Sequence, residues 1–301
     1  MIEVRNLVKK YGDHLAVDHL DFKIEGGRIY GFLGPNGAGK STTMNIMTGY
    51  LGATEGEVII NGHDILKEPE EAKRHIGYLP EQPPLYMDMT VREYLEFAAE
   101  LKGIKKKQRA GQIAEVENLV KIKDVEHRLI KNLSKGYRQR VGLAQAVLGF
   151  PEIIILDEPS VGLDPKQIIE IRELIRKLAK NHTVILSSHI LAEVREVCDY
   201  IIIISKGRLM ASDTPENLER MLGQQNVVEI EVKTSPLEVR RILKNVPGIE
   251  RIEAQTAGNG VTKGSIHEKK GEDIRENVFR AFASAGSPLL TLKVSGTTLE
   301  D

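Results

Sequence analysis

The sequence lacks several features that would assign it to a specialised class of protein. Tryptophan is absent and Cys198 is the only cysteine, which excludes a disulfide within the chain and fits a reducing compartment. The densest apolar runs, Ile153–Leu156 and Ile201–Ile204, are far shorter than the roughly 18 residues of a spanning helix. We expect no transmembrane segment, and a cytoplasmic protein, because no apolar signal core follows Met1.

An excess of charge of one sign is also lacking. The 42 Lys and Arg residues balance 43 Asp and Glu residues, so the basic surface of a dedicated nucleic-acid-binding protein is missing and we expect no nucleic acid partner. The local exception is the basic run Lys105–Arg109. It fits a solvated helix end or loop, and contact with anionic lipid headgroups is the alternative.

What is present is typical of a globular protein of two domains. The 301 residues are 41% hydrophobic and 28% charged. Strands are predicted at Ile2–Val8, Ala16–Ile24 and Arg28–Leu33, and the third is apolar enough to be buried on both faces. It leads through a glycine-rich turn into a helical segment, Ser41–Met47. Strand, loop and helix thus follow in the order of a phosphate-binding unit.

Helical periodicity replaces strands from Thr90 to Gly149. Strands and a helix then alternate, which predicts a parallel α/β sheet. The helical segments of the first region include Val91–Leu101 and Ile113–Val120, and the later elements are Ile153–Leu156, Pro165–Lys180 (helix), Thr183–Ser187 and Tyr200–Ile204.

A polar link, Gly223–Asn226, separates a second unit. Its predicted order of strand, helix, strand, strand, helix, strand is that of an α+β ferredoxin-like domain. Because it has no cluster of His, Cys or carboxylates, we expect it to pack on the first unit or on a second copy, a regulatory site being the alternative. The domains are predicted at 1–222 and 227–301, and the elements of the second at Val227–Val232, Pro236–Asn245, Glu250–Gln255, Gly264–Lys269, Glu272–Ala285 and Leu289–Val294.

A phosphate-binding loop is the clearest motif. The segment Gly34–Ser41 reads GPNGAGKS and matches G-x-x-x-x-G-K-[ST]. Glycines let backbone N–H groups approach phosphates, Lys40 adds charge there, and the Ser41 hydroxyl suits Mg²⁺. A simple strand-to-helix turn is the alternative. The predicted nucleotide-binding residues are Gly34, Pro35, Asn36, Gly37, Ala38, Gly39, Lys40, Ser41 and Thr42.

Two adjacent carboxylates, Asp157 and Glu158, end the apolar strand Ile153–Leu156. Neighbouring side chains of a strand point in different directions, so the two can serve different atoms. Asp157 is predicted to hold Mg²⁺, and Glu158 to orient or deprotonate the water that attacks the γ-phosphate. Together with the phosphate loop they indicate a P-loop NTPase.

The segment Leu133–Arg140, LSKGYRQR, resembles the signature of the ATP-binding cassette (ABC) ATPases, which usually reads L-S-G-G-Q. Ser134 and Gly136 keep the hydroxyl and the backbone N–H donors of that signature. Lys135 and Tyr137 depart from it, and these departures resemble those in the ATPase subunits of exporters for drugs, lipids or polysaccharides. Ser134 also suits the N-cap of a helix over Gln139–Leu148. A capped helix end attracts anions, so both roles are compatible.

The resemblance covers most of Met1–Leu222 and implies a cassette with a parallel core sheet, an antiparallel β subdomain and an α-helical subdomain at about 88–150. It implies that Tyr11 stacks on adenine, although a packed Tyr is an alternative. It places Asp164 in a loop at a dimer interface, although Asp164 before Pro165 also suits a helix N-cap.

Further site residues follow from the same resemblance. His189, after the strand Thr183–Ser187, matches the switch histidine that senses γ-phosphate, although a histidine at a strand end is often incidental. The loop Tyr78–Pro84 connects core and helical insert, where the family commonly has Gln. Here Glu81 stands at that position and Gln82 follows it, and the sequence leaves open which of them acts. The last residues, 297–301, resemble a segment that continues further in relatives.

The implied function is that of an ATP-hydrolysing subunit of a transporter, an exporter by resemblance. Its cofactors would be ATP and Mg²⁺, and its partners an integral membrane permease and a second copy or a related subunit in a head-to-tail dimer, on the inner face of the cell membrane. The alternative is a soluble mechanical ATPase acting on DNA or the ribosome; such relatives usually have paired cassettes, coiled coils or basic arms, which this chain lacks. A small-molecule kinase would not explain Ser134–Gly136 or the helical insert.

Overall fold

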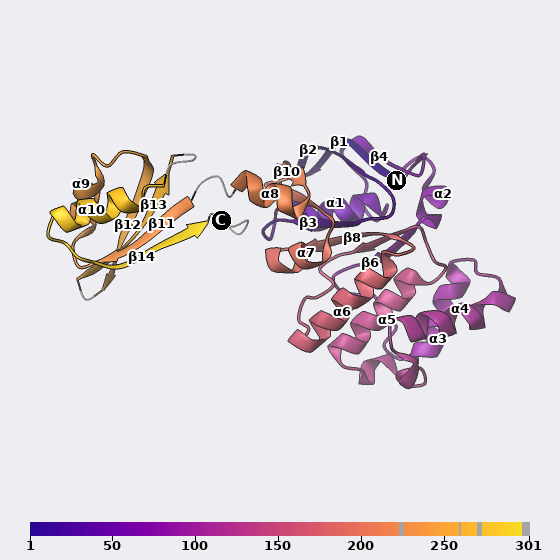
Figure 1. Cartoon of the computed structure of the whole chain (residues 1–301). Coiled ribbons are helices and arrows are strands. Elements are labelled where there is room, and N and C mark those ends of the chain that lie inside the picture. Colours follow the sequence, from indigo (N-terminus) through magenta and orange to yellow (C-terminus); the bar gives the residue numbers. More distant parts are fainter. Residues whose placement is uncertain (223–225, 259, 270–272, 297–301) are drawn as a thin grey trace. The chain divides into compact units, whose positions relative to one another are not determined.

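The computed structural model describes residues 1–222, 226–258, 260–269 and 273–296. The chain forms two compact units, Met1–Pro215 and Glu216–Asp301, which Figure 1 shows and which are described separately. The predicted link at 223–225, the predicted helix start at Glu272 and the segment 297–301 lie outside the described residues. Among the residues described, no helix has the length and apolar character needed to cross a membrane.

The first unit begins with a four-stranded antiparallel sheet in the order β2-β1-β4-β5. In β2, buried and exposed residues alternate towards its end, as they do when one face of a strand meets a core. This sheet supplies one edge of the pocket described below. Its strands are β1 (Ile2–Tyr11), β2 (His14–Ile24), β4 (Glu55–Ile60) and β5 (His63–Asp64).

The second sheet has the order β10-β9-β3-β8-β7-β6, and all its neighbours are parallel except the edge strand β10. Strands β3, β7 and β8 are buried along their whole length, which confirms the prediction of a parallel sheet. The carboxyl ends of parallel strands meet at one edge, and ligands bind there. The strands are β3 (Ile29–Leu33), β6 (Ile76–Leu79), β7 (Ile153–Leu156), β8 (Thr183–Ser188), β9 (Tyr200–Ser205) and β10 (Arg208–Asp213).

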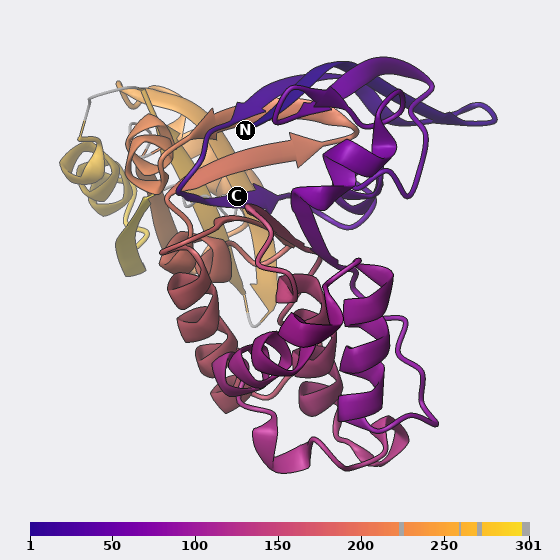
Figure 2. The same cartoon turned by 90° about the vertical axis from the view of Figure 1, so that its right-hand side faces the viewer.

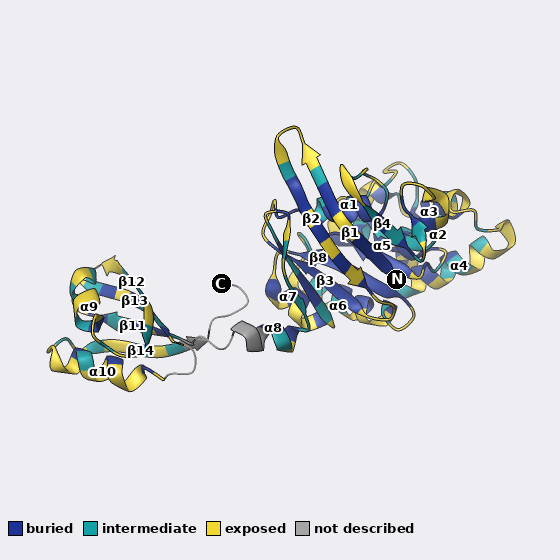
Figure 3. Ribbon diagram, turned by 90° about the horizontal axis from the view of Figure 1, so that it is seen from above, coloured by how far each residue is buried: buried dark blue, intermediate teal, exposed yellow. Residues whose placement is uncertain are grey.

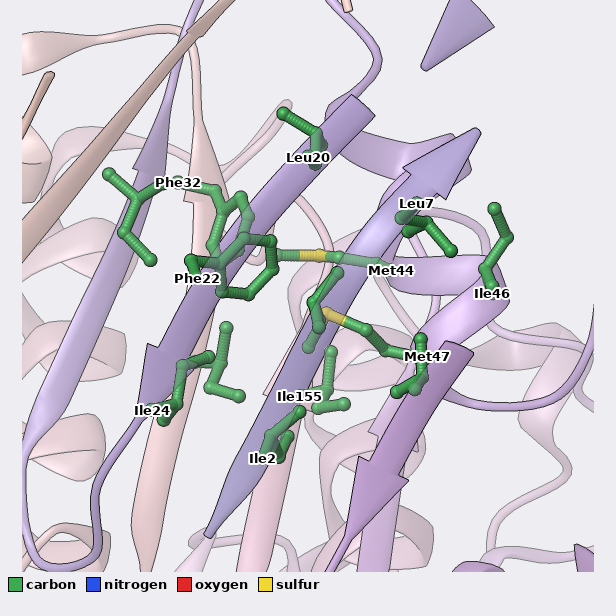
Figure 4. Close-up of a cluster of buried hydrophobic side chains, with 14 of the residues drawn as sticks. Ile2, Leu7, Leu20, Phe22, Ile24, Phe32, Met44, Ile46, Met47 and Ile155 are labelled. Atoms are coloured by element: carbon green, nitrogen blue, oxygen red, sulfur yellow. The ribbon is translucent and has the colours of Figure 1, made fainter. Parts of the chain in front are cut away.

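The main hydrophobic core lies between these two sheets, around helix α1 (Lys40–Met47). Figure 4 shows Met44 and Met47 of α1 among side chains of both sheets. Phe22 and Phe32, one from each sheet, pack edge to face with ring centroids 5.3 Å apart. Because Met44 and Met47 are fully buried, α1 is fixed directly behind the phosphate loop.

Helices gather at one end of the first unit, as the magenta ribbons of Figure 2 show. Helix α3 begins with a capping box formed by Thr90 and Glu93. The Lys102 ammonium, just after α3, donates to the carbonyls of Gln145, Ala146 and Leu148 at the end of α5, at 2.7, 3.2 and 2.7 Å. The helices here are α3 (Val91–Leu101), α4 (Lys106–Leu119) and α5 (Lys135–Val147), with short 3₁₀ turns at Lys123–Val125 and Ile130–Asn132.

Several elements escaped prediction. The loop predicted from Tyr78 is wrong at its start, because Tyr78 and Leu79 end strand β6. Strands β4, β5 and β10 were also missed, as were three short helices, α2 (Pro69–Arg74), α7 (Leu191–Val197) and α8 (Pro215–Leu222). Helix α6 (Pro165–Leu178) was predicted with a C-terminus two residues further on.

From Asn226 onwards, the elements of the second unit follow as strand, helix, strand, strand, helix, strand. Its sheet is antiparallel in the order β12-β13-β11-β14. Along β11, Val228, Ile230 and Val232 are buried against Phe282 while Glu229 is exposed, an alternation visible in Figure 3. The elements are β11 (Asn226–Val232), α9 (Pro236–Leu243), β12 (Ile249–Gly258), β13 (Val261–Glu268), α10 (Arg275–Ser284) and β14 (Leu289–Gly296).

Candidate functional site: a nucleotide-binding pocket

The phosphate loop joins the end of β3 to the start of α1, and its backbone demands glycine. Gly37 and Gly39 have φ angles of 79° and 103°, a region that other residues seldom occupy. A Cβ atom on Gly39 would lie 2.6 Å from the carbonyl oxygen of Ala16. The loop therefore needs glycine at Gly39 both for its conformation and for its approach to β2.

Lys40, the first residue of α1, reaches back into its own loop. Its ammonium donates to the carbonyl of Gly34 at 2.7 Å and of Pro35 at 3.3 Å, and lies 3.5 Å from Oε1 of Glu158. The side chain is buried. A cation is thus held where the loop N–H groups and the N-terminus of α1 converge, an arrangement suited to a phosphate group.

The two carboxylates at the end of β7 face different partners. Asp157 Oδ1 accepts from Ser41 Oγ at 3.2 Å and from Ser187 Oγ at 2.6 Å, whereas Glu158 faces Lys40. The same Ser187 hydroxyl accepts the backbone N–H of Glu158 at 2.8 Å. Glu158 has a φ of 47°, a left-handed conformation that costs about 1–3 kcal/mol outside glycine and needs support from its surroundings.

His189 follows β8 and lies against Glu158, with 3.0 Å between Nδ1 and Oε2. Strand β6 brings Tyr78 to the same region, where its hydroxyl donates to Asn45 of α1 at 2.9 Å. Burial, followed by the nearby charge of Asp157, raises the pKa of the Tyr78 phenol. Tyr78 therefore remains a protonated donor at neutral pH and anchors α1 to the sheet.

One pocket of about 470 Å³ is bordered by residues 36–42, Glu158 and His189, whereas Gly34, Pro35 and Asp157 are not among its lining residues. Tyr11 forms part of its wall and is 47% exposed, with the ammonium of Lys9 5.3 Å from the centre of one ring face. Of the pair left open by the sequence, Glu81 lines the pocket and Gln82 is not among the lining residues. The lining comprises Tyr11, His14, Ala16, Asn36, Gly37, Ala38, Gly39, Lys40, Ser41, Thr42, Glu81, Glu158, Val161 and His189.

Sequence reasoning missed three kinds of contributor. His14 and Ala16 border the pocket because β1 turns directly into β2, which pairs Tyr11 with His14. Val161 borders it from the loop after Glu158. Ser187 was treated only as part of a strand, and a buried serine in an apolar strand was the available signal, since a buried hydroxyl requires a partner.

Ser134, Lys135, Gly136 and Asp164 lie outside the pocket lining. Ser134 is the N-cap of α5 and accepts the N–H of Tyr137 at 3.4 Å. Asp164 is the N-cap of α6 and accepts the N–H of Gln167 at 2.9 Å. Both capping alternatives are therefore present in the structure. Gly136 packs on Gln167, since a Cβ there would lie 2.6 Å from that side chain.

The oxygen atoms of Ser41 and Asp157 are of the type that binds Mg²⁺. Ser41 and Asp157 offer a hydroxyl and a carboxylate, which are hard oxygen ligands of the type that Mg²⁺ prefers together with waters and phosphate oxygens. No group of three or more His, Cys, Asp or Glu side chains suited to a metal occurs among the described residues. In proteins Mg²⁺ usually binds one or two carboxylates together with waters and substrate phosphates, so an ion bound by Ser41 and Asp157 would be shared with a nucleotide.

Known proteins are similar to this chain in sequence and in fold. Residues 17–161 match the family described as ABC transporter. The bacitracin transport ATP-binding protein BcrA of Bacillus licheniformis is 41% identical over 222 residues, which cover 73% of this chain and 72% of that protein. A solved ATP-binding subunit of an ABC transporter is 31% identical with a TM-score of 0.68, covering 74% and 93%.

A second solved structure is also similar to this chain. It is a dimeric post-hydrolysis state of the ATP-binding cassette MJ0796 bound to ADP and Pi, 26% identical with a TM-score of 0.65, covering 71% of this chain and 98% of that chain. The predicted cassette fold is thereby confirmed for the first unit. The chain belongs to the ABC transporter ATP-binding proteins and is an ATP-binding, ATP-hydrolysing member of that family.

Proposed function

We propose that this chain drives export through a separate membrane permease, and that two cassettes close head to tail on two ATP molecules. The observation that carries the proposal is the division of the site. The phosphate loop, Glu158 and His189 border the pocket, whereas Ser134 and Gly136 lie outside it. The N-terminus of α5 is thus available to an ATP molecule held by a second cassette.

Within each pocket the chain's own residues have distinct roles. Lys40 and the loop N–H groups bind the phosphates, and Tyr11, half exposed on the pocket wall, stacks on adenine. Glu158 orients or deprotonates the attacking water, and His189, hydrogen-bonded to Glu158, responds to the γ-phosphate. Ser41 and Asp157 would hold Mg²⁺, which supplies charge neutralisation at the phosphates when bound. Glu81, on the pocket wall, fills the role of the family's Gln.

Export is supported by two features. The departures at Lys135 and Tyr137 resemble those of exporter subunits, and the relative BcrA is named for bacitracin transport. The permease would recruit the chain to the inner face of the membrane. We further propose cassette and accessory domains at 1–222 and 227–301, the second ferredoxin-like; the order of its elements and strands supports this.

A gentle membrane extraction with the full chain as bait tests the proposal. The proposal is supported if an integral membrane protein is recovered in stoichiometric amount in the presence of ATP, and if it is lost after protease removes its cytoplasmic loops. Ribosomes or DNA recovered in stoichiometric amount, with no membrane protein, would instead support the soluble mechanical ATPase.

A further inference from the structure

The first unit buries a carboxylate, Glu193, that does not border the nucleotide pocket. Glu193 belongs to α7 and is 8% exposed. A carboxylate is costly to bury unless hydrogen bonds or an ion pair compensate. Its partners therefore indicate why it is there.

Two serine hydroxyls donate to the same oxygen of Glu193. Ser160 Oγ lies 2.6 Å from Oε2, and Ser188 Oγ lies 3.1 Å from it. Ser160 is two residues after Glu158, in the loop that leads to Asp164. Ser188 immediately precedes His189. One oxygen atom thus joins the two segments that carry Glu158 and His189.

The rest of the network restrains each segment further. Ser188 Oγ also accepts the N–H of Ile190 at 3.0 Å, so its hydroxyl spans the turn that contains His189. Glu193 Oε1 faces the guanidinium of Arg172 at 4.0 Å, and Arg172 lies on α6, which begins directly after the loop. A movement of residues 160–164 therefore displaces Glu193 through its bond with Ser160. Glu193 in turn acts through Ser188 on the turn that contains His189.

We propose that Glu193 is a positioning residue for ATP hydrolysis, which couples the interface loop 160–164 to His189 and keeps His189 against Glu158. The inference rests on the proposed roles of Glu158 and His189. Because Glu193 touches neither the phosphate loop nor Tyr11, it should govern turnover and leave ATP binding unchanged.

The test compares the steady-state ATPase of the full chain with that of Glu193→Ala, at a protein concentration where wild-type specific activity no longer rises. Loss of the acceptor should lower kcat about 10- to 100-fold, since small misplacements of catalytic groups have effects of this size. The KM for ATP should stay within about twofold. Glu193→Gln should recover most of the activity, because its carbonyl oxygen can still accept both hydroxyls.

A double-mutant cycle separates coupling from general damage. If Glu193 acts through His189, Glu193→Ala should change kcat little in a His189→Ala background, whereas independent effects would multiply. Glu196→Ala is the matched control on the same helix, because Glu196 pairs with Arg172 but contacts neither serine. Its kcat should equal that of wild type. Thermal unfolding checks folding, and Ser160→Ala and Ser188→Ala replace Glu193→Ala if that variant does not fold.

Three results would each overturn the role of Glu193. They are effects on kcat that multiply in the double variant, a raised KM with normal kcat in Glu193→Ala, and a Glu193→Gln variant as inactive as Glu193→Ala. Full activity of His189→Ala alone would overturn both this inference and the proposed role of His189. A low kcat for His189→Ala together with normal kcat for Glu193→Ala would overturn the inference and leave the proposed site standing.

Discussion

Ser187 offers a sharp test of how the two carboxylates are held. Its hydroxyl is completely buried, donates to Asp157 and accepts the backbone N–H of Glu158. In Ser187→Ala that N–H loses its acceptor, which costs about 1–3 kcal/mol, and Asp157 loses a donor, worth about 1 kcal/mol more. We expect the free energy of unfolding to fall by about 2–4 kcal/mol.

Activity should fall as well, because the lost bond supports Glu158 in its left-handed conformation. A drop in kcat of about tenfold or more is expected, with a smaller change in the KM for ATP. Urea unfolding and steady-state ATPase measurements give the two quantities. Ser212→Ala is the control, since Ser212 is a partly buried strand serine whose hydroxyl donates to Tyr200, away from both carboxylates. Unfolding within about 0.5 kcal/mol of wild type together with normal kcat for Ser187→Ala would refute the reasoning.

Three further predictions concern other parts of the site and fold. Tyr11→Ala should raise the KM for ATP about tenfold, the effect of losing one stacking contact, while Tyr11→Phe keeps it near wild type. Lys102→Met should lower the free energy of unfolding by about 1–3 kcal/mol without changing kcat, because three carbonyls at the end of α5 lose their donor. Urea unfolding measures this change, with Lys106→Met as the control variant. Chelation of Mg²⁺ with EDTA should abolish phosphate release but leave binding of a fluorescent ATP analogue measurable; phosphate release that continues in EDTA would contradict a shared Mg²⁺ site.

The parallel sheet and its phosphate loop were predictable because their signals are local. Apolar runs such as Ile153–Leu156 are long enough to indicate strands buried on both faces. The glycine pattern before Lys40 is specific for a phosphate-binding loop. Asp157 lies beside the loop, within hydrogen-bond distance of Ser41, because parallel strands end at one edge of the sheet. Such signals depend on neighbouring residues in the sequence and not on distant contacts.

Strand β6 shows what local signals omit. It is only four residues long and contains Gly77, which weakens a strand pattern. A Cβ at Gly77 would lie 2.0 Å from the carbonyl oxygen of Ala146 in α5, so glycine is needed for the approach of that helix. Gly77 thus serves packing against helix α5, which lies far from it in the sequence.

The contacts of Ser187 and Glu193 were likewise not predictable. Each joins residues from separate strands, loops and helices, and no spacing in the sequence indicates that Ser160 and Ser188 meet one carboxylate. Ser134 and Asp164 show the reverse case. Their capping roles were visible locally, while any role across a dimer depends on a second chain.

In the proposed function, two chains together complete each ATP site. The most direct measurement is the mass in solution of Glu158→Gln with ATP and Mg²⁺, by light scattering across a range of protein concentrations. We expect a stable species of twice the 33.5 kDa of one chain, which disappears on removal of ATP. A variant that binds ATP and stays monomeric, beside a wild-type ATPase whose specific activity is independent of protein concentration, would contradict it.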